Sequence, residues 1–156
     1  MSKDLKFLQS AFALAQIWSK DPSSKVAAVA VGDTPNLVAW GYNGFPPGIA
    51  DTENRLFNRE VKYSLVLHAE ENALANATFP VRTLYVTHPP CQGCALRILG
   101  YRSVLRVVCA KPSPEFQDRW HASIKQTLAL FEEAGVKYEE IDVWNSLPWT
   151  QQSPVP

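Results

Sequence analysis

Four residues in the middle of the chain have the types and spacing of a catalytic metal centre: His68, Glu70, Cys91 and Cys94. Imidazole and thiolate groups are preferred zinc ligands, and three protein ligands leave the fourth tetrahedral position open for water. A glutamate that is not a ligand can take a proton from that water and later give it to a ring nitrogen or a leaving amine. The residues therefore predict a hydrolytic zinc site, with Glu70 catalytic and the other three as metal ligands.

The spacing of these residues requires two helices that begin at the metal. His68 and Glu70 are two residues apart, and in the middle of a helix their side chains would point to nearly opposite sides. Both can face one metal only at a helix start, and the small and apolar residues 73–77 support a short helix there. A second helix that begins at Pro90-Cys91 puts both thiols on one face. Helix N-termini favour thiolate and hydroxide and lower the pKa of a nearby thiol.

The order His-x-Glu followed by Pro-Cys-x-x-Cys is similar to the signature of zinc nucleobase deaminases at all five positions. Other interpretations stay open. The residues could form a structural zinc knuckle, or a cysteine pair with an unrelated histidine, although neither interpretation explains Glu70. His88 precedes Cys91 by three residues, and as a fourth ligand it would make the site closed and inert.

Composition favours one α/β domain that folds without disulfides. Of the 156 residues 46% are hydrophobic, which is enough for an ordinary core. The 15 basic and 15 acidic residues cancel, so no overall charge attracts polynucleotides or anionic lipid. Cys109 lies in an apolar run and is expected to be a buried strand residue. Unpaired thiols, with no signal peptide and no apolar run of membrane length, predict a reducing, cytoplasmic location.

Hydrophobic periodicity predicts helices that alternate with strands after an opening hairpin. Helices are expected at 3–19, from about 68, and from about 90 to a glycine cap at Gly100. After a break at 111–114, a longer helix is expected that ends at Gly135. Strands are expected at 26–31, 37–40, 83–87, 103–110 and 136–143, with a long functional loop over 41–63. This order predicts a three-layer α-β-α architecture around a mixed sheet of about five strands, with both metal-binding helices on one face. Residues 1–143 form the predicted deaminase domain, and 144–156 an irregular tail.

Further segments resemble deoxycytidylate deaminases more closely than other zinc deaminases. They are the run 19–26, the loop 41–46, and the residues Asp51, Arg55, Lys62 and Tyr63. The resemblance covers residues 19–110 and implies the cytidine deaminase-like fold, with hydrolysis of dCMP to dUMP and ammonia for thymidine nucleotide supply. Where the family usually has Val-Gly-Ala, this chain has Val26-Ala27-Ala28. We expect a small packing change there.

The resemblance also implies where the nucleotide binds. Asn43 is a candidate sugar contact because an amide both donates and accepts, but it is equally a turn-forming residue before Gly44. Candidate phosphate donors, which could instead be solvated turn residues, cluster at a strand entrance: Lys20, Ser23, Ser24 and Lys25. Trp120 with Arg119 is a candidate flap over the base or phosphate, and Trp120 as core is the alternative.

Deaminases of this family are typically oligomers, often hexamers, which dCTP activates and dTTP inhibits at a second nucleotide site. Effector candidates here are Gly41, Tyr42, Asn43, Gly44, Asp51 and Arg55, with loop rigidity as the alternative. Predicted partners are a small nucleotide, triphosphate effectors with Mg²⁺ as a second candidate ion, and further copies of the chain, a hexamer favoured, without polynucleotide or membrane. Two other functions stay open: a zinc deaminase acting on dCTP, cytidine or a purine base, and a noncatalytic zinc-stabilised module that binds nucleotides or a partner protein.

Overall fold

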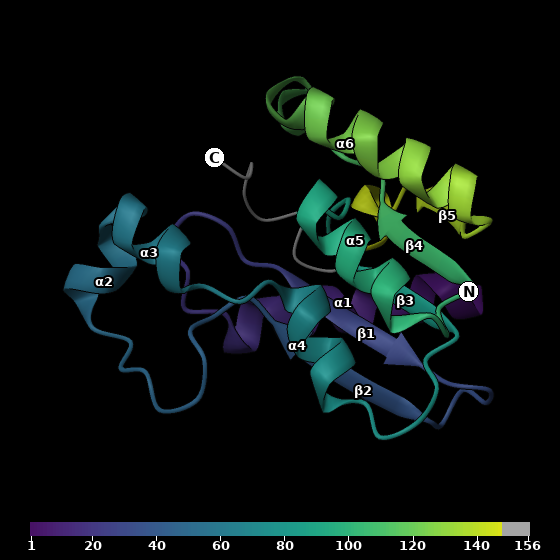
Figure 1. Ribbon diagram of the computed structural model, residues 1–156, viewed down its shortest axis with the longest axis horizontal. Helices are drawn as coiled ribbons and strands as arrows, with labels where there is room; N and C mark the ends of the chain where they lie inside the picture. Colours follow the sequence, from purple (N-terminus) through teal and green to yellow (C-terminus); the bar gives the residue numbers. More distant parts are fainter. Residues whose placement is uncertain (148–156) are drawn as a thin grey trace.

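A mixed five-stranded sheet forms the centre of the computed structural model, which describes residues 1–147 (Figure 1). The strand order is β2-β1-β3-β4-β5. The strands are β1 (Ala27–Val31), β2 (Val38–Tyr42), β3 (Thr83–Val86), β4 (Arg106–Ala110) and β5 (Lys137–Ile141). β1 pairs antiparallel with β2 and β3, whereas β3, β4 and β5 run parallel. The predicted mixed sheet is confirmed.

Helices cover both faces of this sheet. They are α1 (Lys3–Trp18), α2 (Glu53–Phe57), α3 (Arg59–Leu65), α4 (Ala69–Asn76), α5 (Gln92–Tyr101) and α6 (Pro114–Ala134), followed by the 3-10 helix η1 (Trp144–Ser146). One apolar cluster joins the sheet to α4, α5 and α6 through Ala73, Ile98 and Phe131. A second joins the opposite face to α1 through Leu8 and Phe12. Figure 1 shows α1 behind the sheet and the other three helices in front. Both helices expected at the metal therefore lie on one face, as predicted.

Side-chain caps define most helix starts. The side chains of Ser2, Thr52, Asn58 and Ser113 each accept a hydrogen bond from a backbone N–H in the first turn of a helix. Pro114 occupies the first turn of α6, where its missing N–H has no cost. Gly135 ends that helix with φ +74°. The predicted end of this helix at Gly135 is confirmed.

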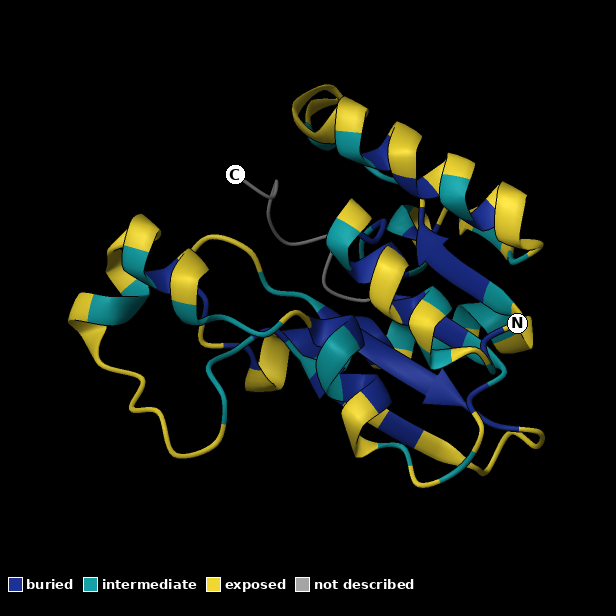
Figure 2. Cartoon of the chain, viewed as in Figure 1, coloured by how far each residue is buried: buried dark blue, intermediate teal, exposed yellow. Residues whose placement is uncertain are grey.

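The expectation of one long loop over residues 41–63 is wrong, because α2 and most of α3 lie within it. Thr52 and Asn58 cap the starts of these helices. The helices are too short for an apolar periodicity to be visible in the sequence. The two helices pack on each other, and Figure 2 shows them largely exposed, away from the sheet. Lys62, which is 4% exposed, is the one residue of the two helices that is buried.

Three local expectations also need correction. Gly100 does not end α5, which continues to Tyr101 and closes on Arg102 in the left-handed region at φ 69°. The hairpin forms, but β2 is not buried throughout, because it is the edge strand and alternates between buried and exposed residues. Of the segment expected to be an irregular tail, residues 148–156 lie outside the described residues. Its beginning forms η1, and Leu147 after it is buried against the α1 cluster.

None of the helices in residues 1–147 has both the length and the apolar character needed to cross a membrane.

An ion-pair network fixes α1 to the parallel half of the sheet. The Arg106 guanidinium on β4 donates to both carboxylate oxygens of Asp4, at 2.8 and 2.7 Å, and also contacts Glu139 on β5. The Tyr85 hydroxyl on β3 donates to the same carboxylate at 2.7 Å. Hydrogen bonding from Arg106 lowers the pKa of Asp4 to about 2. The carboxylate is therefore stabilised as an anion in the folded chain.

This network predicts a pH-dependent contribution to stability. The folded pKa of Asp4 lies below the unfolded value of about 3.9, so its contribution is complete above about pH 5 and is lost as the pH falls toward 2. Asp4→Asn should lower the free energy of unfolding by about 1 kcal/mol at pH 7 and by less at pH 3, as measured by urea unfolding. Asp33→Asn is the control, since the Asp33–Arg82 pair is exposed. An equal loss for Asp4→Asn at both pH values would contradict the assignment.

Candidate active site

Three side chains come together with the geometry of a metal centre. The ligand atoms of His68, Cys91 and Cys94 all lie within 4.8 Å of one another. His68 Nδ1 is 3.1 Å from Cys94 Sγ and 3.5 Å from Cys91 Sγ. Tetrahedral zinc with bonds of about 2.0–2.3 Å sets such donor atoms roughly 3.5 Å apart. One nitrogen and two sulfur donors at these separations fit zinc, and the set leaves one position open.

The start of a helix positions each half of this group. His68 is the N-cap of α4 and Cys91 the N-cap of α5, so both ligands precede the first helical turn. Glu71 Oε2 accepts a hydrogen bond from the His68 N–H at 3.0 Å, and the other oxygen pairs with Arg97 on α5. Arg97 in turn donates to the Gly93 carbonyl, between the two cysteines, at 3.0 Å. The two helix starts are thus linked through one ion pair.

Helix α6 supplies hydrogen bonds to the start of α5. The Ser123 hydroxyl on α6 accepts from the Gln92 N–H at 3.1 Å, and the buried Thr127 hydroxyl donates to the Pro90 carbonyl at 2.9 Å. These bonds satisfy backbone groups on both sides of Cys91 that the helix itself leaves unpaired.

The pKa values of the two thiols shift in opposite directions. A hydrogen bond from Cys94, together with one from His68, lowers the pKa of Cys91 to about 4. The same hydrogen bond and burial raise the pKa of Cys94. Hydrogen bonding to Cys91 raises the pKa of His68. Zinc takes thiolate and neutral imidazole ligands, so its binding would release the protons that these three groups carry.

Glu70 lies beside this group in the first turn of α4, as its spacing from His68 predicts, and is 5% exposed. Burial raises its pKa to about 7. A carboxyl group with that pKa can both accept and release a proton near neutral pH. Glu70 is not part of the three-residue metal group.

His88 is not a fourth ligand. Among the described residues the metal-binding group contains only His68, Cys91 and Cys94. The His88 Nδ1 atom instead lies 2.9 Å from the hydroxyl of Thr87. The site therefore keeps the open position that hydrolysis requires.

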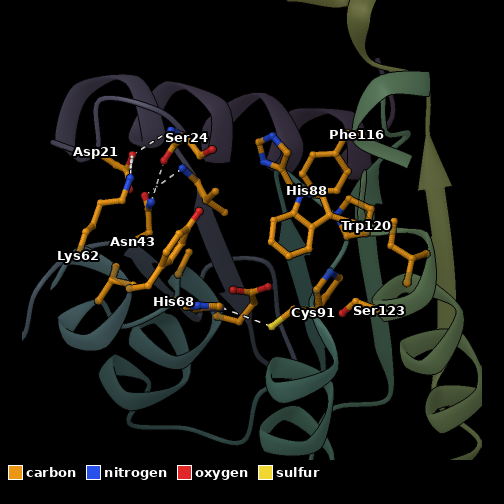
Figure 3. Close-up of a pocket in the computed structure, with 18 residues that line it drawn as sticks. Asp21, Ser24, Asn43, Lys62, His68, His88, Cys91, Phe116, Trp120 and Ser123 are labelled. Carbon is orange, nitrogen blue, oxygen red and sulfur yellow. Dashed lines mark hydrogen bonds and ion pairs between the residues drawn. The ribbon is translucent and has the colours of Figure 1, made fainter. Parts of the chain in front are cut away.

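A pocket extends from the metal group between two contrasting walls (Figure 3). One wall is polar and includes Asp21, Ser24, Asn43 and Lys62. The other is largely aromatic: His88, Phe116 and Trp120, with Phe116 and Trp120 centroids 6.2 Å apart. Trp120 is 37% exposed, so it is a pocket wall residue, not a core residue. A planar base fits between such walls.

The polar wall is held by internal bonds. Asn43 Oδ1 accepts from the Ser19 hydroxyl at 2.6 Å and from the Val26 N–H at 3.0 Å, and its Nδ2 donates to the Ser24 carbonyl at 2.8 Å. The buried Lys62 ammonium pairs with Asp21 at 3.1 Å. Asn43 therefore fixes the loop and still faces the pocket.

The remaining candidates divide between two pockets. A second, smaller pocket is lined by Lys20, Tyr42, Asn43, Gly44 and Asp51 among others. Lys20 was predicted as a phosphate donor together with Ser23, Ser24 and Lys25. In the structure its ammonium lies in this second pocket and pairs with Asp51 at 2.6 Å. Ser23, Lys25, Arg119, Gly41 and Arg55 line neither pocket. Lys25 bonds the Ser19 carbonyl, and Arg55 donates to the Ala50 carbonyl at 3.0 Å. A side chain at Gly41 would bring Cβ within 2.4 Å of the Ala73 nitrogen, which indicates a packing role.

Several residues of the pocket were missed from the sequence. Phe116 and Ile124 share a face of α6 with Trp120 at helical spacing, so that periodicity could have indicated them. No local pattern marks Lys62 as buried, because its partner Asp21 lies 41 positions earlier.

The fold and the site together define a class, the zinc-dependent hydrolases with a buried carboxylate beside an open metal position. Residues 1–111 match the family model described as the cytidine and deoxycytidylate deaminase zinc-binding region. The chain is 36% identical over 137 residues to an uncharacterized deaminase from the luxG 3′ region of Aliivibrio fischeri, covering 85% of this chain and 91% of that protein. It is also 36% identical over 149 residues to the deoxycytidylate deaminases of Mus musculus and Homo sapiens, covering 86% of this chain and 76% of each.

The chain therefore belongs to the cytidine and deoxycytidylate deaminase family, and it is a zinc-dependent hydrolytic deaminase. The recognition of this family from the metal signature and the loops is confirmed.

The Glu71–Arg97 pair should matter for metal retention. Arg97→Ala frees Glu71 and the Gly93 carbonyl, so we expect zinc affinity to fall about tenfold, the low end for groups that orient metal ligands, since Arg97 is 60% exposed. Competition with a chelator of known affinity measures this. Leu96→Ala, at the exposed neighbouring position, is the control. Wild-type affinity in both variants would show that the pair does not orient the ligands.

Proposed function

We propose that this enzyme hydrolyses dCMP to dUMP and ammonia and so supplies thymidine nucleotides. The observation that carries the proposal is the buried Glu70 carboxyl beside an open three-ligand metal group, at the end of a pocket with one polar and one aromatic wall. Relatives named deoxycytidylate deaminase align over most of the chain. The loops 19–26 and 41–46, on which the resemblance to such enzymes rests, contribute Asp21, Ser24 and Asn43 to the polar wall.

The reaction exchanges the amine on C4 of cytosine for the oxygen of water. Zinc held by His68, Cys91 and Cys94 would lower the pKa of a water molecule toward about 7 and so supply the nucleophile near neutral pH. Glu70 takes the proton that the water loses and delivers it to N3 of the base as the C4–O bond forms. Glu70 then moves the proton of the new C4 hydroxyl to the amine, the C4–N bond breaks, ammonia leaves and the oxygen remains as the C4 carbonyl. The raised pKa of Glu70 suits both transfers.

The nucleotide lies in this proposal with its base between the walls and its sugar toward Asn43. Asn43 has one amide proton beyond the bond to Ser24, which can reach a sugar hydroxyl. Ser24 and Trp120 are the remaining candidate substrate contacts that line the pocket. Four candidate donors do not line this pocket: Ser23, Lys25, Arg119 and the exposed Lys20. We propose that they contact the nucleotide only if the protein rearranges on binding, or act on its phosphate at longer range.

Regulation by dCTP and dTTP belongs to the same proposal. The second pocket brings Tyr42, Asn43, Gly44 and Asp51 together with Lys20, whose ammonium suits a phosphate. Gly41 and Arg55 flank it in the chain, and Mg²⁺ would accompany a triphosphate there. The proposed assembly is a homo-oligomer, with a hexamer favoured. Cys91, Cys94 and Cys109 form no disulfide with one another, which suits a reducing compartment, and we place the enzyme in the cytoplasm.

Glu70→Gln should retain zinc and lose turnover. The amide keeps the shape of the side chain but cannot carry protons, so kcat for dCMP should fall about a thousandfold, measured by ammonia release with zinc content in parallel. Glu133→Gln, at an exposed position on α6, is the control. An unchanged kcat in Glu70→Gln would remove Glu70 from the mechanism, whereas wild-type protein that holds zinc but releases no ammonia would favour a noncatalytic zinc-stabilised module.

The substrate is tested with a panel of dCMP, dCTP, cytidine, deoxycytidine and guanine. We expect the highest kcat/KM for dCMP. Equal or better turnover of dCTP, cytidine or guanine would assign the chain to another branch of the zinc deaminases, whatever the result with Glu70.

Regulation predicts sigmoidal dCMP kinetics that dCTP makes hyperbolic and that dTTP suppresses. Steady-state rates with each effector, with and without Mg²⁺, measure this, and sedimentation of the same sample gives the oligomer size. A hyperbolic curve that neither triphosphate changes would remove the effector site from the proposal but not the dCMP reaction.

A further inference from the structure

His88 is a polar residue of the aromatic wall for which the deamination chemistry above has no role. Its ring lies 5.2 Å from the Phe116 ring and 6.5 Å from the Phe12 ring, measured between centroids. Figure 3 shows it beside Phe116 on the upper wall of the pocket, whereas His68 and Cys91 lie at the lower end. The imidazole therefore faces the pocket from a position away from the metal group.

A short relay of hydrogen bonds fixes the proton on this imidazole. The Ala27 N–H donates to the hydroxyl oxygen of Thr87 at 3.2 Å, and that oxygen lies 2.9 Å from His88 Nδ1. Thr87 is 1% exposed, and no other described residue offers its hydroxyl proton an acceptor. The hydroxyl therefore donates to Nδ1. A neutral imidazole that accepts at Nδ1 carries its proton on Nε2.

The ring is neutral at physiological pH, because burial among apolar side chains lowers the pKa of His88 to about 4. Its Nε2–H has no hydrogen-bond partner among residues 1–147. Removing water from an N–H donor at an apolar wall costs free energy, unless a ligand atom accepts the hydrogen bond that the water accepted before. The wall therefore presents one oriented, uncharged donor to whatever fills the pocket.

We propose that His88 is a substrate-binding residue whose Nε2–H donates a hydrogen bond to an oxygen of the bound nucleotide. The inference rests on the proposed nucleotide substrate. With the amine-bearing carbon at the metal group, the remaining oxygens of a cytosine nucleotide belong to the base carbonyl, the sugar and the phosphate. Each is a hydrogen-bond acceptor, which an Nε2–H donor can recognise and a purely aromatic wall cannot.

Three substitutions separate binding from packing. His88→Phe keeps the aromatic packing, and His88→Asn places an amide near the Nδ1 position, within reach of Thr87, but cannot reach the pocket. His88→Gln places an amide donor near the Nε2 position. We expect kcat/KM for dCMP to fall about three- to tenfold in the Phe and Asn variants, chiefly through KM, and to recover in His88→Gln. Zinc content and thermal midpoint are measured alongside for each variant.

Comparison of dCMP with deoxycytidine identifies the oxygen. A loss seen only with dCMP assigns it to the phosphate, and an equal loss with both substrates assigns it to the base or the sugar. Either result supports the proposal. An unchanged KM for both substrates in the Phe and Asn variants, with wild-type activity present, would overturn it.

Nitrogen NMR of the zinc-loaded wild-type protein, labelled at histidine, provides a readout that does not depend on folding of the variants or on turnover. The ¹⁵N shifts should show His88 protonated at Nε2 and should change at that nitrogen when dUMP, the reaction product, is added. A proton on Nδ1, or an Nε2 signal indifferent to saturating dUMP, would overturn the proposal. Wild-type protein that deaminates no nucleotide would instead refute the proposed function.

Discussion

The packing of α4 against α5 sets the distance between the two halves of the metal group. His68 precedes one helix and Cys91 the other, so each ligand alone is fixed only relative to its own helix. The Glu71–Arg97 pair joins the two helix starts, and two hydroxyls of α6 bond the start of α5. Because these helices also rest on one apolar cluster, a shift of either would cost core packing as well as ligand geometry. The same helix packing that stabilises the fold therefore also fixes the geometry of the metal group.

Adjacent residues of α4 show how one helical turn separates chemistry from support. Glu70 points inward, where burial raises its pKa to about 7, while Glu71 accepts from the His68 N–H and pairs with Arg97. Consecutive helical residues diverge by about 100°, so one carboxylate can serve proton transfer and the next can orient a ligand. The chemical identity of the two side chains is the same, and their surroundings give them different properties.

The polar wall of the pocket also lies against the smaller pocket beside it. Asp21, Asn43, Lys62 and Val66 contribute to both. Asn43 bonds the loop before β1, and Lys62 joins α3 to that loop through Asp21. These buried bonds leave the wall few alternative arrangements, since breaking the Lys62–Asp21 pair would leave a buried charge without its partner. The two pockets therefore share a wall that is stabilised by an ion pair and by the hydrogen bonds of the Asn43 side-chain amide.

The sequence by itself determined the metal group, the position of Glu70 beside it and the three-layer fold, because each depends on short spacings or on hydrophobic periodicity within one segment. His68 and Glu70 needed only a helix start, and Gly135 needed only its backbone freedom. Tertiary structure decided what depends on residues far apart in the chain. It buried Lys62 against Asp21, turned His88 from the metal toward Thr87, and moved Lys20 to a separate pocket with Asp51. Burial and hydrogen-bond partners arise only when distant segments meet, so no local pattern could have indicated them.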